Sequence, residues 1–192
     1  MAEATSVYYE NLIKRVLEHS VSNEWSIAVS EWKMIDVEED SWCESQCVCG
    51  KENIRYLFTI KNIYNNNKIN PIGSRCIKRF NVKELSELVS LKESLFKLLH
   101  AVEENKFIEF SSELFSRKLL KHLYDLGAFM ATEYNDYEPY NDYEFLLKMF
   151  NKSEAKRTEK QKKKAIAIVL SSIKPFLKAE LKQKKEGGVT NG

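Results

Sequence analysis

The chain has 192 residues, of which 43% are hydrophobic and 30% are charged. This composition supplies enough apolar surface for a packed core and excludes a fully disordered protein, and the length allows one or two domains. The longest uninterrupted apolar run, residues 165–170, is far shorter than the roughly 20 residues that cross a bilayer. We therefore expect a cytoplasmic protein with neither a membrane span nor a signal peptide.

The net charge of +2 hides an uneven distribution of charge. Residues 152–186 carry twelve basic and four acidic residues, hence +8, whereas the remaining chain carries 18 basic and 24 acidic residues, hence −6. Such a division predicts either a polyanionic partner or pairing between the two parts of the chain.

The first 82 residues suggest a helix followed by a small β module. Apolar residues recur at helical spacing in residues 1–24, which predicts an amphipathic helix that ends near residues 20–23. Residues 25–37 alternate with period two and predict one or two short strands, and the acidic residues 38–40 predict a loop. Residues 54–63 and 69–72 predict a β-hairpin with an asparagine tip at residues 65–67, so that residues 25–82 form one module.

The rest of the chain has a helical pattern. In residues 83–132 we expect a helical body with one helix to about residue 104 and another at 114–126, capped by Ser111 or Ser112 and ended by Gly127. Residues 133–186 should hold an acidic tyrosine loop, a short helix at 143–150 and basic helices that begin at a Thr158–Gln161 capping box. Pro175 should kink or stop the last helix, and residues 187–192 should form a disordered tail.

The predicted fold class is therefore mainly α with a small β-hairpin, an α+β protein in which a helical body accompanies an N-terminal zinc-bound β module. All four cysteines, Cys43, Cys47, Cys49 and Cys76, fall in that module. Zinc prefers four soft or borderline ligands in a tetrahedron, and in a reducing compartment clustered cysteines favour metal over disulfides. Gly50 permits a tight turn after Cys49, and pairing of the hairpin strands would return Cys76 to that turn. Cys43 is then the natural fourth ligand.

Two other interpretations of the cysteines stay open. They can be buried, inert thiols, because free cysteine behaves as a small hydrophobic residue. A redox pair is the less favoured alternative, since the spacing of Cys47 and Cys49 is not the two-residue spacing of thioredoxin-like sites.

The cysteine segments also carry a resemblance to known proteins. The motifs are Cys47-Val48-Cys49-Gly50, then Ile60-Lys61-Asn62, then residues 71–80 with the sequence Pro-Ile-Gly-Ser-Arg-Cys-Ile-Lys-Arg-Phe. Together they resemble a cysteine module of uncharacterised proteins from Gram-positive bacteria, their phages and large DNA viruses. Residues 158–161 and 173–177 are similar to the helical tail of the bacterial and phage members. The resemblance implies a metal module and a phage or mobile-element origin, and it implies no activity.

Basic residues next to the cysteines and in the C-terminal part predict contact with nucleic acid. Lysine and arginine neutralise phosphates without reading sequence, and arginine, the better reader of bases, is rare in the tail. A solvated helix face is the equally weighted alternative for the tail. The candidate nucleic-acid contacts are Lys68, Arg75, Lys78, Arg79, Lys83, Lys156, Arg157, Lys160, Lys162, Lys163 and Lys164.

The acidic tyrosine loop has three possible roles. It can be a polar loop with half-buried tyrosines, it can pair with the basic tail, or it can form an anionic, aromatic surface that binds a protein. The residues of that candidate surface are Tyr134, Asp136, Tyr137, Glu138, Tyr140, Asp142, Tyr143 and Glu144.

The sequence favours a protein that is not an enzyme, because it contains no glycine-rich phosphate loop, nucleophile elbow or paired-histidine zinc motif. The leading hypothesis is a zinc-dependent binding protein of phage or mobile-element type that contacts nucleic acid. The first alternative is a phage-encoded inhibitor that binds a host protein such as a CRISPR or other defence nuclease. The second alternative is an unrecognised nuclease.

Overall fold

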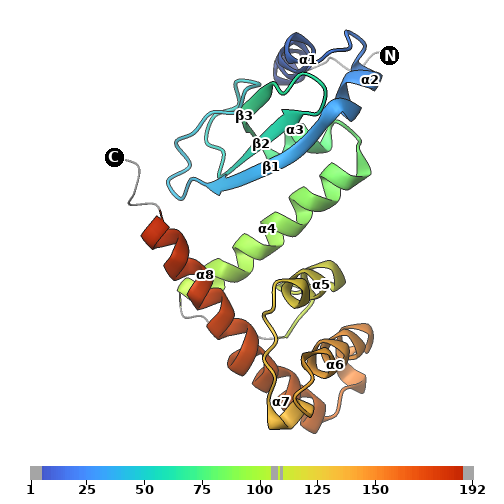
Figure 1. Ribbon diagram of the computed structural model, residues 1–192, viewed down its shortest axis with the longest axis vertical. Coiled ribbons are helices and arrows are strands. Elements are labelled where there is room, and N and C mark those ends of the chain that lie inside the picture. The colour runs from blue at the N-terminus through green and yellow to red at the C-terminus, as the bar shows by residue number, and fades with distance from the viewer. Residues whose placement is uncertain (1–5, 105–107, 109, 188–192) are drawn as a thin grey trace. The chain divides into compact units, whose positions relative to one another are not determined.

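The computed structural model describes residues 6–104, 108 and 110–187 and divides into two compact units, unit 1 (Met1–Glu93) and unit 2 (Ser94–Gly192) (Figure 1). The protein is mainly α-helical with one small antiparallel sheet, which confirms the predicted fold class. The boundary between the units falls inside helix α4 (Lys83–Glu103), a helix that the sequence assigned wholly to a helical body. None of the described helices has an apolar stretch long enough to span a membrane.

Unit 1 contains the sheet, in which β1 (Trp32–Glu39), β2 (Tyr56–Asn62) and β3 (Lys68–Ile72) lie side by side in that order (Figure 1). The predicted hairpin is confirmed as β2 and β3. The expectation of a loop at the acidic residues was wrong, because Glu38 and Glu39 belong to β1 and pair there with Leu57 and Tyr56. An edge strand tolerates charged side chains, so pairing with β2 decides the structure of these residues.

Helices cover the core of unit 1. Helix α1 (Val7–His19) ends close to the predicted residue and buries Leu12 and Val16. Of the one or two strands predicted in residues 25–37, β1 is present, whereas residues 25–31 form helix α2 (Trp25–Ala28) and a 3₁₀ turn (Val29–Glu31). The short helix α3 (Ser74–Lys78) follows β3 and contacts β2. The buried core shared by these elements includes Leu12, Val16, Phe58, Ile60, Ile72 and Ile77.

A buried carboxylate joins the helical start of unit 1 to the turn of the hairpin. Glu31 accepts hydrogen bonds from the Val21 and Ser22 amides at 2.7 and 2.8 Å and from Asn62 Nδ2 at 2.6 Å. Burial raises the pKa of Glu31, but these three donors outweigh burial and leave the pKa below its usual value. The ionised carboxylate therefore stabilises the fold of unit 1.

Unit 2 consists of helices: α5 (Arg117–Asp125), α6 (Pro139–Asn151), α7 (Glu159–Ile168) and α8 (Lys174–Gly187), with 3₁₀ turns at Glu133–Asn135 and Glu154–Lys156. Helix α5 starts later than predicted and is capped by Ser116, whose Oγ accepts a hydrogen bond from the Leu119 amide at 3.1 Å. The prediction of Ser111 or Ser112 as the cap was therefore wrong. Gly127 follows the helix with φ +78°, as expected for a left-handed residue at a helix end.

The predictions for the C-terminal helices are confirmed in part. The Thr158–Gln161 capping box is present, whereas α6 begins at Pro139 and not at Tyr143. Pro175 does not stop the helix, because α7 continues through a π-helical turn (Val169–Ile173) into α8. Proline lacks an amide donor, and a wider turn just before it is one way to accommodate the missing hydrogen bond. Of the predicted tail 187–192, Gly187 ends α8 and the rest lies outside the described residues.

Candidate metal centre

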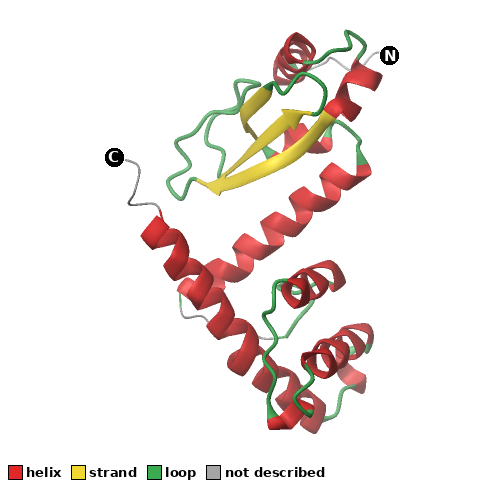
Figure 2. Ribbon diagram, viewed as in Figure 1, coloured by secondary structure: helices red, strands yellow, loops and turns green. Residues whose placement is uncertain are grey.

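The connection between β1 and β2 is a loop that carries Cys43, Cys47 and Cys49 (Figure 2). Its tightest part is the turn from Cys47 to Lys51. The Gly50 amide donates to the Cys47 carbonyl and the Cys47 amide donates to the Lys51 carbonyl, each at 2.8 Å. Gly50 has φ +89°, a conformation that side chains disfavour, so glycine permits the turn that directs both sulfurs to one side.

Hydrogen bonds fix this turn to the rest of unit 1. The Val48 amide donates to the Pro71 carbonyl at the end of β3 at 2.9 Å, and Asn11 Nδ2 of α1 donates to the Cys49 carbonyl at 3.1 Å. Helix α3 begins three residues after Pro71 and carries Cys76. The hairpin therefore returns Cys76 to the turn, as the sequence predicted.

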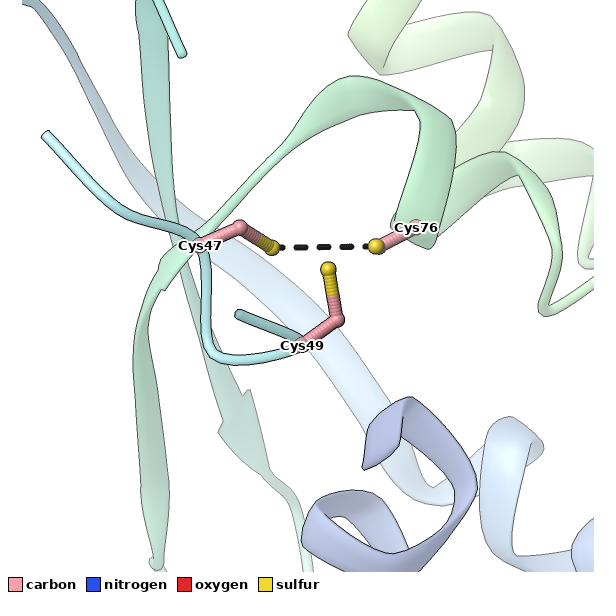
Figure 3. A group of neighbouring side chains, drawn as sticks. All are labelled: Cys47, Cys49 and Cys76. Atoms are coloured by element: carbon pink, nitrogen blue, oxygen red, sulfur yellow. Dashed lines mark hydrogen bonds between the residues drawn. The ribbon is translucent and has the colours of Figure 1, made fainter. Parts of the chain in front are cut away.

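The sulfur atoms of Cys47, Cys49 and Cys76 point toward one another and lie within 4.8 Å of each other (Figure 3). Those of Cys47 and Cys76 are 3.6 Å apart. Two sulfurs that share a tetrahedral zinc ion, each about 2.3 Å from it, lie about 3.8 Å apart. The three thiols are thus placed so that they could hold one metal ion.

The protonation of the three thiols differs. A hydrogen bond from Cys76 lowers the pKa of Cys47 to about 5, against the effect of burial and with help from the Cys49 and Gly73 amides. Burial raises the pKa of Cys49, and the interaction with Cys47 raises that of Cys76. At neutral pH the cluster without metal therefore holds one thiolate and two thiols.

Cys43, the predicted fourth ligand, is not brought into this group. It lies in a turn that Asp40 organises: Asp40 Oδ2 accepts from the Glu44 and Ser45 amides at 2.9 and 2.8 Å, and the Cys43 amide donates to the Asp40 carbonyl. Cys43 itself has φ +54°. Spacing along the chain suggested a ligand, but this local turn holds the Cys43 backbone in a different arrangement. The fourth position of a tetrahedral ion would thus be filled by water or another group.

The three cysteines line a cavity of about 690 Å³ that also carries basic and aromatic side chains. Four of its lining residues are cationic and three are tyrosines, and none is an aspartate or glutamate. We call this cavity the basic pocket. Its charged, aromatic and thiol-bearing residues are Lys51, Arg55, Arg75 and Arg79, Tyr8, Tyr9 and Tyr56, and Cys47, Cys49 and Cys76.

Two of the predicted nucleic-acid contacts near the cysteines, Arg75 and Arg79, line the basic pocket. The other three, Lys68, Lys78 and Lys83, are not among its lining residues. Lys78 instead pairs with Glu93 at 2.9 Å. Sequence reasoning missed Lys51 and Arg55. Both lie within five residues of the Cys47–Gly50 turn, and that proximity was the available signal.

The predicted contacts of the tail fall into two groups. Arg157 is half-buried, donates to the Lys152 and Phe110 carbonyls at 3.0 and 3.4 Å, and has its guanidinium 5.7 Å from the centre of the Phe110 ring. It therefore serves the structure of unit 2. The lysines lie on a 3₁₀ turn and on α7: Lys156, Lys160, Lys162, Lys163 and Lys164, of which Lys162 pairs with Glu159 and Lys164 lies 4.8 Å from the Phe145 ring centre.

The candidate protein-binding surface is smaller than the sequence suggested. Asp142 is 5% exposed and accepts a hydrogen bond from Asn135, Tyr143 stacks on Tyr124 with ring centres 4.8 Å apart, and Glu144 pairs with Lys148. These three side chains are committed to contacts inside unit 2. Four residues, Tyr134, Asp136, Tyr137 and Glu138, are exposed and make no such contact with another helix of the described part of the chain. Tyr140 is half-exposed and packs against Tyr124.

Comparisons with known proteins identify no relative. The chain matches no protein-family model, and neither the curated proteins nor the solved structures include one that is significantly similar to it.

Proposed function

We propose that this protein is a zinc-dependent, non-enzymatic nucleic-acid-binding protein in which Cys47, Cys49 and Cys76 hold the ion. Zinc is the metal that thiolate ligands in a tetrahedral arrangement most often bind in proteins, and the separations of the sulfurs suit it. The ion would connect the Cys47–Gly50 turn to α3. It would therefore add to the stability of unit 1.

The observation that carries the nucleic-acid part is the charge of the basic pocket. Lys51, Arg55, Arg75 and Arg79 line it without any carboxylate among the lining residues. Arg55 is paired with Glu39 at 3.5 Å, and this carboxylate is only 13% exposed, so Arg55 adds less positive charge to the pocket than the other three cations. Arginine forks bind phosphate oxygens in pairs, so the pocket favours a polyanion.

The proposed metal ligands and the cations of the basic pocket are close together in the sequence. Lys51 is two residues from Cys49, Arg75 is adjacent to Cys76, and Arg79 is three residues further along. A metal ion that fixes the two cysteines therefore fixes the spacing of these cations. We expect nucleic-acid binding to weaken when zinc is removed.

The test is nucleic-acid binding as a function of salt. If all four cations neutralise phosphates, the logarithm of the affinity for a single strand should fall with the logarithm of salt concentration with a slope of about −3. The double variant R75Q/R79Q should reduce that slope by about 1.4. The matched variant K160Q/K163Q, in the exposed part of α7, measures the separate contribution of the tail. Absence of binding at about 50 mM salt would contradict the proposal.

A second candidate function is protein recognition, which the loop in unit 2 favours. Asn135 is buried and donates from Nδ2 to the Met130 carbonyl and to Asp142 Oδ2, both at 2.8 Å. It therefore holds the loop on which Tyr134 and Tyr137 are 83% and 72% exposed. Exposed tyrosines in a fixed loop with acidic neighbours are suited to a basic protein surface.

The resemblance noted in the sequence is the support for phage or mobile-element origin, and with it for an inhibitor of a host protein. This candidate predicts a host protein that the native chain retains at moderate salt and that Y134S/Y137S loses. If no host protein binds the native chain more strongly than Y134S/Y137S, the inhibitor hypothesis is wrong. An observation that favours the nuclease alternative is the set of three cysteines, because catalytic zinc ions also have three protein ligands and one bound water.

A further inference from the structure

The basic pocket has the size of a site for one small molecule. Its volume of about 690 Å³ lies in the range of about 300 to 1,000 Å³ that small-molecule and cofactor sites occupy, and it is too small for a duplex. The buried sulfurs of the cysteines form part of its wall. A nucleic-acid strand can therefore place one nucleotide in it.

The charge of the pocket favours a doubly charged group. A phosphodiester in a strand carries one negative charge, whereas a terminal phosphate monoester carries between one and two at neutral pH. Four cations line the pocket against a net charge of about −1 from zinc with three thiolates, and this positive excess stabilises the monoester more strongly. Arg75 and Arg79 are four residues apart at α3 and its C-terminal end, a spacing that places two side chains on the same side of a helix.

One of these cations is held in place by an aromatic ring. The guanidinium of Arg79 lies 4.7 Å from the centre of the Tyr9 ring, and Tyr9 in turn makes an edge contact with Trp25 at 6.1 Å. Stacking on a ring leaves the edge of the guanidinium, with its N–H donors, directed to the side. Arg79 is therefore prepared for a bidentate contact with phosphate oxygens.

The remaining aromatic residues suit a nucleoside. Tyr8 is 47% exposed and Tyr56 is half-buried, and both line the pocket beside the cations. Any base can stack on a tyrosine, because every base has a π-face. The pocket thus combines a site for a phosphate with surfaces for a base.

We propose that the basic pocket binds the terminal nucleotide of a nucleic-acid strand, with the terminal phosphate monoester held by Arg75, Arg79, Arg55 and Lys51 and the nucleoside against the tyrosines. This inference rests on the proposed function and specifies its ligand: a phosphorylated strand end. It predicts recognition of ends without preference for sequence.

The experiment compares single strands of one sequence that carry a phosphate or a hydroxyl at the 5′ end, or at the 3′ end, with the fluorescent label at the opposite end. Fluorescence anisotropy with the zinc-loaded full chain should show one phosphorylated end bound at least about tenfold more tightly than its hydroxyl counterpart. The variant R75Q/R79Q should remove that difference. The matched variant K68Q/K83Q, outside the pocket, should keep the ratio even if it weakens both strands.

Zinc content and circular dichroism show whether R75Q/R79Q is folded. The ratio of the affinities for phosphorylated and hydroxyl ends, measured on the native chain, decides the inference without any variant. Equal affinity for phosphate and hydroxyl ends overturns it and leaves nucleic-acid binding intact. Calorimetry with adenosine monophosphate tests whether the pocket binds a nucleotide when the protein does not bind long strands. Binding of the mononucleotide without binding of long strands supports the pocket ligand and overturns the proposed function, and binding of neither overturns both.

Discussion

The number of protons released when the metal binds follows from the pKa values of the three thiols. Cys47 is ionised at neutral pH because its pKa is about 5, whereas Cys49 and Cys76, whose pKa values are raised above the usual 9.0, hold their protons. A metal ion needs three thiolates and must displace two protons. Its affinity should therefore rise about 100-fold per pH unit between about pH 6 and pH 8, or about 2.7 kcal/mol per unit.

Competition with a chromophoric chelator of known proton affinity measures this dependence over that pH range. Calorimetry in two buffers with different ionisation enthalpies gives the proton count independently. Below about pH 5 Cys47 becomes protonated too, so the slope should increase toward three. The control is C43S, which should leave the slope unchanged since Cys43 is outside the cluster. A slope of three at neutral pH would refute the argument, because it would mean that Cys47 keeps its proton.

Three further predictions concern residues that the structure connects. C76S should abolish stoichiometric zinc binding and lower the thermal midpoint of unit 1, whereas C43S should retain the metal, as measured by metal analysis and calorimetry. E31Q should lose about 1 to 3 kcal/mol of unfolding free energy in urea at pH 7, because its amide group faces backbone donors. The pKa of Glu31 is lowered on folding, so the native chain should lose this stabilisation as the pH falls below the usual glutamate pKa of 4.5, a loss that E31Q should not show. N135A should cost about 2 to 3 kcal/mol, since it leaves the buried Asp142 without its amide donor, while the exposed Y134S should change stability by less than about 0.5 kcal/mol.

Elements with strong local signals were predictable from the sequence. The hairpin of β2 and β3 followed from branched and aromatic residues around three asparagines, and the start of α7 followed from the reciprocal bonds of Thr158 and Gln161. The cluster of Cys47, Cys49 and Cys76 followed from the turn at Gly50 and the return of the hairpin. In these cases a few neighbouring residues determine the structure.

Predictions were wrong where the local structure depends on residues that are distant in the sequence. Glu38 and Glu39 are strand residues because β2 pairs with them, and no pattern in residues 38–40 contains that information. Ser116 caps α5 although Ser111 and Ser112 are equally good caps by residue type. Cys43 has ligand chemistry but lies in a turn held by Asp40, and Lys51 and Arg55 become pocket residues only through folding of unit 1.

X-ray absorption at the zinc edge, on protein purified without chelator, tests the metal centre most directly. The ligand set predicts one zinc ion per chain with three sulfur neighbours at about 2.3 Å and one lighter neighbour. Absence of stoichiometric metal, or an ion surrounded by oxygen and nitrogen alone, would contradict the assignment of Cys47, Cys49 and Cys76 as ligands.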